Sequence, residues 1–419
     1  MNLFSMLSFH ISTRACLGAA ALLMCTGLHA QIESNDSSIV DLPKVTVVAS
    51  RVEQSTGVVG ASVTTLDLDD LLRYEHELAS DVIRHVEGVY LRNNGNPGST
   101  AGMSMRGLPL APVVLIDGIE VNDPGSGFVY NFGNLPLASI DRIEVLRGAQ
   151  SALYGANALT GVISITTRQG ETTQPAAAVG ASYGSRDSVR AFATLSQATE
   201  SVDYFVTATY EDTDGYSVQN PEWGPEWADD DLFRNQTMMG KLKWKLSDRV
   251  DLVLFGSYQD SKSEYDPGLP SPWTQPVMDN FYESEQFLSK AQLSATLSQA
   301  WISNVAVHYN DFRSYAVDSF GVRDNKADLL KFEWLNDLRI ADWLNSIVGL
   351  EWERAEDRIG SHSMDTAAVF VENVLTLSDA LHATVALRLD DNDAYGREVS
   401  WRTSASYALP NDRTRLKAS

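Results

Sequence analysis

The sequence has only two cysteines, and both lie near its start. Cys16 and Cys25 fall in one apolar run between Arg14 and Ala30. A basic start, a short apolar core and a small residue at a cleavage position are typical of a secretory signal peptide, so we expect residues 1–30 to be removed on export. The exported chain would then hold no disulfide, and its stability must come from other interactions.

Basic residues and long apolar runs are also scarce. The 419 residues include 32 Lys and Arg against 55 Asp and Glu, a formal charge of −23 that would repel a nucleic-acid backbone. Beyond the signal peptide, no stretch approaches the roughly 18 apolar residues of a membrane-spanning helix. These absences exclude nucleic acid as a default partner, and any insertion into a membrane would have to use strands.

Histidines are few and scattered, which argues against an enzyme. Of the 7 histidines, His10 and His29 lie in the signal peptide, and the others form no pair at metal-ligand spacing. A hydrolase in a barrel wall would need a converging serine and histidine, for which His382 is a weak candidate. We expect no catalytic residue and no catalytic cofactor.

Residues 63–170 have the mixed pattern of a compact α+β domain, with dense glycine in its second half. Thr65 and Ser80 stand where N-cap residues would begin two short helices. The expected helices are residues 66–73 and 80–86, and the expected buried strands are residues 113–118 and 162–167.

From Ala177 onward, apolar and polar residues alternate. In residues 241–247 and 292–298 every apolar side chain falls on one face, and residues 382–390 depart from this only at Ala386. Alternately short and long loops separate these segments, as in a transmembrane β-barrel. A soluble β-sandwich also has alternating strands, but the signal peptide, the missing cysteines and Trp and Tyr near strand ends favour the barrel.

The size of the mixed domain tests whether this barrel is complete. The alternating region holds roughly 12 strands of ~10 residues. Twelve tilted strands close a cylinder of about 24 Å, and 22 strands one of about 44 Å. A globular domain over residues 42–170 is about 36 Å across. Because residues 414–419 also look like the opening of a further strand, we expect a truncated part of a longer protein.

Three motifs stand in a fixed order within the mixed domain: MSMRGL at 103–108, VLIDGI at 114–119 and IDRIEVLRGAQSALYGANALTGVI at 140–163. Their order and spacing resemble the plug of TonB-dependent outer-membrane receptors. The resemblance implies an α+β plug domain followed by an antiparallel transmembrane β-barrel, 22-stranded in the family, with about 12 strands here. The implied divisions are signal peptide 1–30, N-terminal segment 31–62, plug 63–170 and barrel 171–419.

The resemblance changes the interpretation of residues 45–49. Their periodicity alone suggests an ordinary first strand. In the family, an extended segment ahead of the plug is the TonB box, which adds as a strand to the periplasmic protein TonB. Pro43 and Ser50 suit such a tether. The implied partners are TonB and its inner-membrane energising complex, and the implied TonB-binding residues are Val45, Thr46, Val47, Val48 and Ala49.

Within the family, the similarity is greatest to receptors for cobalamin. Residues 91–102 occupy the place of their first apical plug loop, and residues 229–233, 265–266 and 389–392 also match. Siderophore receptors share the plug motifs, so a ferric siderophore is the alternative ligand. Turn formation is the alternative role for each polar loop residue. The expected substrate-binding residues are Asn93, Asn94, Asn96, Ser99, Thr100, Ser126 and Phe128.

Residues 211–231 hold eight acidic residues and no Lys or Arg. Crowded carboxylates repel one another unless a cation lies between them, and Ca²⁺ takes oxygen ligands from flexible loops. The resemblance to cobalamin receptors implies calcium in these extracellular loops. Ser217 replaces a carboxylate of those receptors, with Asp214 close enough to substitute, and a solvated acidic loop is the alternative. The expected metal ligands are Asp214, Asp229, Asp231 and Asp266.

Arg106, Glu144 and Arg147 lie in the plug motifs beside turns. Charges inside a barrel need partners, so we expect contacts between plug and barrel here, with wall carboxylates holding the two arginines. Taken together with the strand pattern, the resemblance implies a monomeric TonB-dependent transporter in the lipid of a Gram-negative cell outer membrane. A surface binding protein without transport is the competing class, although it would have no use for a TonB box.

Overall fold

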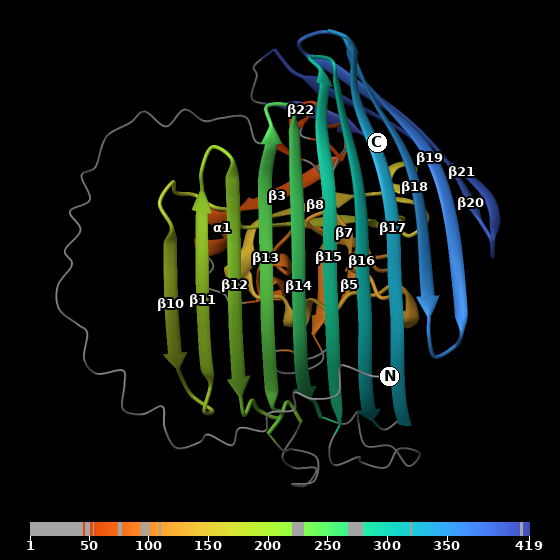
Figure 1. The fold of residues 1–419 in the computed structure, drawn as a ribbon. Coiled ribbons are helices and arrows are strands. Elements are labelled where there is room, and N and C mark those ends of the chain that lie inside the picture. The colour runs from red at the N-terminus through yellow and green to blue at the C-terminus, as the bar shows by residue number, and fades with distance from the viewer. Residues whose placement is uncertain are drawn as a thin grey trace, which may run out of the picture. The chain divides into compact units, whose positions relative to one another are not determined.

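The computed structural model describes residues 45–46, 51–52, 54–73, 78–93, 98, 101–108, 110–219, 230–266, 280–318, 321–410 and 414–419. The expected signal peptide and residues 47–49 of the expected TonB box lie outside the described residues. Figure 1 shows the two main parts of the remaining chain, a mixed α/β domain and a large antiparallel sheet. We call residues 62–167 the plug and strands β10–β22 the wall.

The N-terminal hairpin and the plug are built from short elements. The hairpin pairs β1 (Val45–Thr46) with β2 (Gln54–Ser55). The plug strands are β3 (Ser62–Asp67), β4 (Val89–Asn93), β5 (Ala101–Met105), β6 (Val113–Ile116), β7 (Ile119–Glu120), β8 (Ile140–Arg147) and β9 (Gly161–Thr167). Its helices are α1 (Leu68–Arg73), α2 (Ala79–Ile83) and α3 (Ser151–Tyr154), with 3-10 turns η1 (Pro124–Ser126), η2 (Phe132–Asn134) and η3 (Leu137–Ser139).

Five of the plug strands form one sheet in the order β3-β8-β9-β6-β7. Strands β6 and β9 run parallel and the other neighbours antiparallel, while β4 and β5 pair separately. The centre of this sheet is dry, because Ile143, Val145, Ile163 and Ile165 are fully buried. Burial of such side chains stabilises the domain by about 2 kcal/mol each, before entropy is counted.

The helix boundaries differ from those expected from the sequence. Strand β3 continues through Asp67, which pairs with Arg142 on β8, so α1 begins only at residue 68. Asp67 caps it, since its carboxylate accepts a hydrogen bond from the Asp70 amide at 3.1 Å. Helix α2 begins at residue 79, which places Ser80 inside its first turn. The expected N-caps Thr65 and Ser80 are therefore wrong, because β3 pairs with β8 as far as Asp67 and because Leu78, which bridges to Pro136, is the N-cap of α2.

The wall is one sheet of 13 antiparallel strands, in sequence order, within the described residues. It confirms the expected barrel strands, and a short last strand lies within residues 414–419, where a further strand was expected to open. The strands are β10 (Ala176–Tyr183), β11 (Val189–Ala198), β12 (Val202–Thr213), β13 (Phe233–Ser247), β14 (Val250–Glu264), β15 (Phe281–Ser298), β16 (Trp301–Asp318), β17 (Gly321–Ala341), β18 (Leu344–Asp357), β19 (His362–Thr376), β20 (Leu381–Asn392), β21 (Gly396–Ala408) and β22 (Arg415–Ala418).

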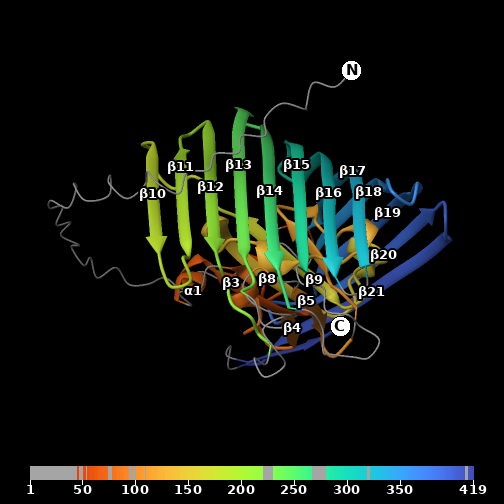
Figure 2. The same cartoon turned by 90° about the horizontal axis from the view of Figure 1, so that it is seen from below.

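Alternation along the wall strands separates two faces, and Figure 2 shows the plug elements against one of them. On β16, the buried residues Ala306, His308 and Asn310 face the plug, whereas Val305 is 53% exposed on the other face. Exposed apolar side chains recur on that outer face, including Phe332, Trp334, Leu350 and Val369. An apolar band of this kind suits contact with lipid.

The helices of the structure are short. Among the described residues, none is long and apolar enough to cross a membrane.

Candidate functional site between plug and wall

The N-terminal segment reaches the wall through Arg51. The guanidinium of Arg51 forms ion pairs with Glu333 on β17 and Glu351 on β18, and the Arg51 side chain is only 10% exposed. It also lies over the rings of Tyr154 and Phe370, at 5.1 and 5.3 Å from their centroids. Burial opposes the charge, but the two carboxylates outweigh it and raise the pKa of Arg51. The arginine is therefore a fixed cation that joins the segment to both plug and wall.

A second attachment follows β2. The Gly57 carbonyl accepts hydrogen bonds from the Ser406 hydroxyl at 2.7 Å and from Arg415 at 3.0 Å. Gly60 packs so closely on β21 that a Cβ there would lie 2.6 Å from the Ala405 nitrogen. The hairpin is thus held on both sides of β2. Ser406 also pairs in register with His382, the histidine considered above for a hydrolase. The Ser406 hydroxyl donates its hydrogen bond to the Gly57 carbonyl, so the two residues are not arranged as a nucleophile and its base.

The expected TonB box is only partly described. Val45 pairs with Ser55 and Thr46 with Gln54, so the start of the box is a hairpin strand rather than an unpaired tether. Val47, Val48 and Ala49 lie outside the described residues. The pairing with β2 uses one edge of β1, so a strand-adding partner would have to add to the other edge or displace β2.

The turn between β6 and β7 is clamped by the wall. Asp117 adopts a left-handed conformation with φ of 47°. Its carboxylate accepts a hydrogen bond from Lys241 on β13 at 2.9 Å, and its carbonyl accepts one from Lys290 on β15 at 2.8 Å. Asn310 on β16 donates to the Glu120 carbonyl at 2.8 Å. Three wall strands, β13, β15 and β16, therefore hold this one plug turn.

The second apical loop, residues 122–130, is shaped by internal hydrogen bonds. Asn122 accepts from the Val114 amide at 2.7 Å and donates to the Phe128 carbonyl at 2.9 Å. Ser126 lines a cavity of about 270 Å³ that reaches wall strands β14–β16. Phe128 lines a different cavity, of about 750 Å³, against β17–β21. The two expected ligand contacts on this loop thus face separate spaces.

The first apical loop, residues 91–102, is described only in part. Asn94, Asn96, Ser99 and Thr100 lie outside the described residues, and the backbone of Asn93 pairs with Ala101. Gly98 is described, with φ of 81°, and a Cβ there would lie 1.8 Å from the Phe233 ring of β13. A glycine at this position lets the loop touch the wall, which no larger residue would allow without displacement of Phe233.

Among the acidic residues expected as metal ligands, Asp266 has a carboxylate that is already hydrogen-bonded within the protein. The Asp266 carboxylate accepts hydrogen bonds from the Ser217 hydroxyl at 2.9 Å and from the Val218 amide at 2.6 Å. Asp214 donates its backbone amide to the Arg186 carbonyl, and Asp231 is 2% exposed. Within the described ranges, which omit Asp229, no three or more His, Cys, Asp or Glu side chains form a group that could hold a metal ion.

The plug arginines have a different environment from the one expected. Arg147 donates to the Glu87 carbonyl at 2.6 Å and to the hydroxyls of Ser62 and Thr64 at 3.2 and 2.7 Å. These partners belong to the plug, because β3 lies beside β8 and brings its hydroxyls within reach. Burial and the neighbouring Arg106 lower the pKa of Arg147. The expected wall carboxylate is thus not the partner in these contacts.

The other two plug positions also differ in setting. Arg106 is exposed, whereas Glu144 is fully buried with Arg142 at 3.7 Å. Contacts between plug and wall come instead from residues that the sequence did not single out, such as Lys241 and Arg402, which donates to Gln150. For Lys241 and Arg402, the only signal in the sequence was a basic residue at an alternating position of an expected strand.

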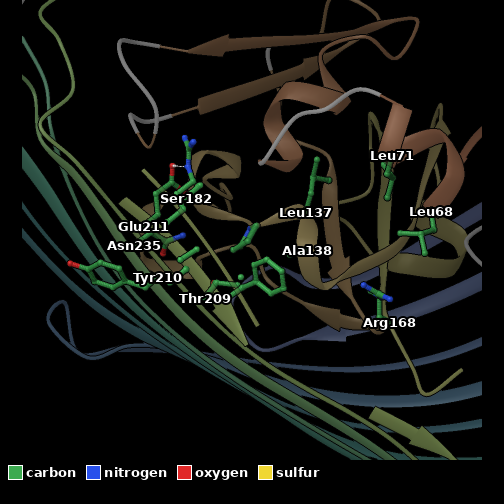
Figure 3. Close-up of a pocket in the computed structure, with 16 residues that line it drawn as sticks. Leu68, Leu71, Leu137, Ala138, Arg168, Ser182, Thr209, Tyr210, Glu211 and Asn235 are labelled. Atoms are coloured by element: carbon green, nitrogen blue, oxygen red, sulfur yellow. Dashed lines mark hydrogen bonds and ion pairs between the residues drawn. The ribbon is translucent and has the colours of Figure 1, made fainter. Parts of the chain in front are cut away.

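A further cavity of about 440 Å³ lies where α1 and η3 approach β10–β12 (Figure 3). Leu68, Leu71 and Leu137 line its plug side. Arg190 and Glu211 on the wall side form an ion pair at 2.9 Å, so their charges are mutually satisfied. This mostly apolar space offers few polar groups to a ligand.

Comparison with known proteins agrees with this architecture. Residues 57–162 match the model of the TonB-dependent receptor plug domain, and residues 180–419 match that of the TonB-dependent receptor-like β-barrel. The chain is 25% identical to the vitamin B12 transporter BtuB of Vibrio vulnificus over 93% of its length, and 27% identical to that of Photobacterium profundum over 95%. It spans 64% of the length of each of these relatives.

Solved structures give the same fold. The siderophore receptor PirA from Acinetobacter baumannii superposes with a TM-score of 0.70 at 19% identity, over 83% of this chain and 59% of that one. At that identity the likeness concerns the fold alone. Because the two family models together cover most of the sequence, the chain belongs to the family of TonB-dependent receptors.

Proposed function

We propose that this protein is an outer-membrane receptor that takes up cobalamin or a related corrinoid with energy delivered by TonB. The observation that supports coupling to TonB is the position of Arg51. It follows the expected TonB box closely, and its guanidinium binds Glu333 and Glu351 of the wall beside Tyr154 of the plug. A pull on residues 45–49 would therefore act on contacts between plug and wall.

The ligand assignment draws on the relatives and on loop chemistry. Two curated relatives named above are vitamin B12 transporters, whereas PirA, a solved structure of lower identity, is a siderophore receptor. A corrinoid is rimmed with amides and needs many hydrogen-bond donors and acceptors, which Asn93, Asn94, Asn96, Ser99, Thr100 and Ser126 would supply, while Phe128 would offer an apolar contact. Ferric siderophore uptake is the second candidate, supported by the shared fold.

Calcium would act in the outer loops. Asp214, Asp229, Asp231 and Asp266 would supply carboxylate oxygens, which are the ligands that Ca²⁺ prefers. The hydrogen bond from Ser217 to Asp266 joins two of these loops without a cation. We therefore expect calcium to strengthen ligand binding moderately rather than to be indispensable.

Calorimetric binding of cyanocobalamin to the purified receptor, with calcium and then with a calcium chelator, tests these proposals. We expect saturable binding at one site, tighter with calcium. Binding that is identical in both solutions would remove the calcium proposal. An absence of cyanocobalamin binding, together with binding of a ferric siderophore, would replace the ligand.

Deletion of residues 42–51 separates transport from simple surface binding. A transporter without this segment should bind its ligand and fail to import it, since TonB would lack its attachment strand. A surface binding protein would lose nothing by this deletion.

A further inference from the structure

The larger cavity, of about 750 Å³, lies between the plug and wall strands β17–β21. Tyr154 and Phe128 line its plug side, and the hairpins that join β18 to β19 and β20 to β21 line its rim. These hairpins lie at the same end of the wall as the long β12–β13 and β14–β15 connections. In outer-membrane barrels the longer loops face the outside, so a ligand arriving from outside would meet this cavity.

Acidic side chains outnumber basic ones in its lining. The bases among the lining residues are Lys331 and Arg388, apart from His362 at the rim. The lining carboxylates are Glu120, Glu351, Glu353, Asp357, Asp390 and Glu398.

Both bases are already engaged by carboxylates. Lys331 lies 3.5 Å from Glu351 and 3.6 Å from Glu353, and Arg388 lies 2.8 Å from both Glu351 and Asp390. Arg51 also pairs with Glu351, so three cations face six lining carboxylates and the cavity keeps an excess of negative charge. Like charges confined between low-dielectric walls attract a cation far more strongly than the same charges would in open water.

Glu120 gives an independent sign that a ligand group is expected here. Its side chain is 6% exposed and lines the cavity, yet its Oε1 accepts no hydrogen bond within the described residues. Burial and the nearby Glu353 raise the pKa of Glu120 to about 7. A buried oxygen without a donor is costly, and a cationic or donor-bearing ligand would relieve that cost.

We propose that this cavity selects ligands by charge, so that the receptor binds corrinoids with a net positive charge more tightly than neutral or anionic ones. The inference rests on the proposed corrinoid function and specifies its substrate class. In a cobalt(III) corrinoid, the metal charge exceeds that of the corrin ring and phosphate by one. An axial water leaves that positive charge in place, whereas an axial cyanide cancels it.

Three probes of one shape test the proposal: aquocobalamin as cation, cyanocobalamin as neutral ligand and a cyanocobalamin monocarboxylic acid as anion. At low salt, where the screening length is about 30 Å, we expect aquocobalamin to bind about tenfold tighter than cyanocobalamin and the acid to bind weakest. At about 1 M salt, where that length is about 3 Å, the differences should shrink to within about twofold. Mildly acidic buffer keeps the axial water protonated.

Matched variants test whether the charge preference arises in this cavity. Asp357→Asn and Glu398→Gln remove charge from the cavity, and Asn at 357 keeps an acceptor for the amides of Ile359 and Gly360. The double variant should lose most of the preference, measured as the ratio of aquocobalamin to cyanocobalamin affinity on the same protein. Glu356→Gln, one residue along β18 on the opposite face, should change neither.

Each possible result of these measurements contradicts one specific proposal. Equal affinity for aquocobalamin and cyanocobalamin at low salt would overturn charge selection and leave corrinoid uptake standing. A preference that survives high salt and disappears in His362→Ala would mean cobalt coordination by that histidine, which also overturns the charge argument. Failure of all three probes to bind would refute the corrinoid function itself.

Discussion

Arg51 and Glu351 form an ion pair between the N-terminal segment and the barrel wall. Glu351 also contacts Lys331 and Arg388, at 3.5 and 2.8 Å, so one carboxylate serves three cations from three parts of the chain. Its side chain is 3% exposed. A buried pair of this kind is costly to break from one side only, because the remaining charge is left uncompensated.

Replacement of this arginine should release the hairpin. Because the exported chain would hold no cysteine, a single spin label at Val45→Cys reports on β1 without interference. We expect Arg51→Ala to raise the mobility of that label and to let a soluble TonB domain bind without ligand. Arg84→Ala, which removes a solvent-exposed pair with Asp81, is the control. Unchanged mobility in Arg51→Ala would show that the wall contact does not hold the segment.

The contact between Lys241 and Asp117 should stabilise the plug more than nearby ion pairs within the wall do. Lys241→Ala leaves the Asp117 carboxylate without its wall partner, at an expected cost of about 2–3 kcal/mol in plug stability. Lys243→Ala, two residues along the same strand, removes only a wall pair with Asp251 at 3.7 Å. Hydrogen exchange of amides 113–120 should accelerate in the first variant and not in the second. Equal exchange in both would indicate that the other contacts carry the turn.

The raised pKa of Glu120 predicts a pH dependence with a definite sign. Because the pKa of about 7 in the folded protein exceeds the usual 4.5, the folded state keeps a proton that the unfolded chain releases. This stabilisation is complete below the unfolded pKa and is lost as pH rises through about 7. Relative to Glu120→Gln, the parent should lose a few degrees of Tm between pH 5 and pH 7.5, roughly 1 kcal/mol or more. A parallel pH response of the two proteins would contradict this account.

If residues 45–49 are the TonB box, a change within them should abolish import and leave ligand binding intact. Val47→Pro removes a backbone donor from the strand that would pair with TonB. Cyanocobalamin affinity should stay unchanged while accumulation in cells falls to that of a strain without TonB. Val47→Ile, which keeps strand propensity, is the matched control and should import normally. Normal import by Val47→Pro would place the box elsewhere.

Periodicity and motif order were sufficient to predict the fold. Strict alternation predicts the wall, because a one-residue slip would turn each apolar side chain to the wrong face. The start of α1 was missed, since Leu66 and Asp67 suit a helix locally but pair with Ile143 and Arg142 of β8. Long-range pairing of this kind leaves no local trace in the sequence.

The site was less predictable than the fold. Arg147 was recognised as a buried charge that needs partners, but hydroxyls of Ser62 and Thr64 satisfy it, and hydroxyls carry no distinctive pattern. The acid-lined cavity combines residues from β7 and from β17–β21, up to 278 positions apart between Glu120 and Glu398. These residues come together only because the plug packs against the wall and the wall strands pair in one register.

TonB-dependent uptake of labelled cyanocobalamin tests the central claim most directly. Cells that produce the receptor should accumulate the label against its gradient, and deletion of TonB should abolish accumulation while surface binding remains. Accumulation that continues without TonB, or a receptor that neither binds nor imports the label, would contradict the account.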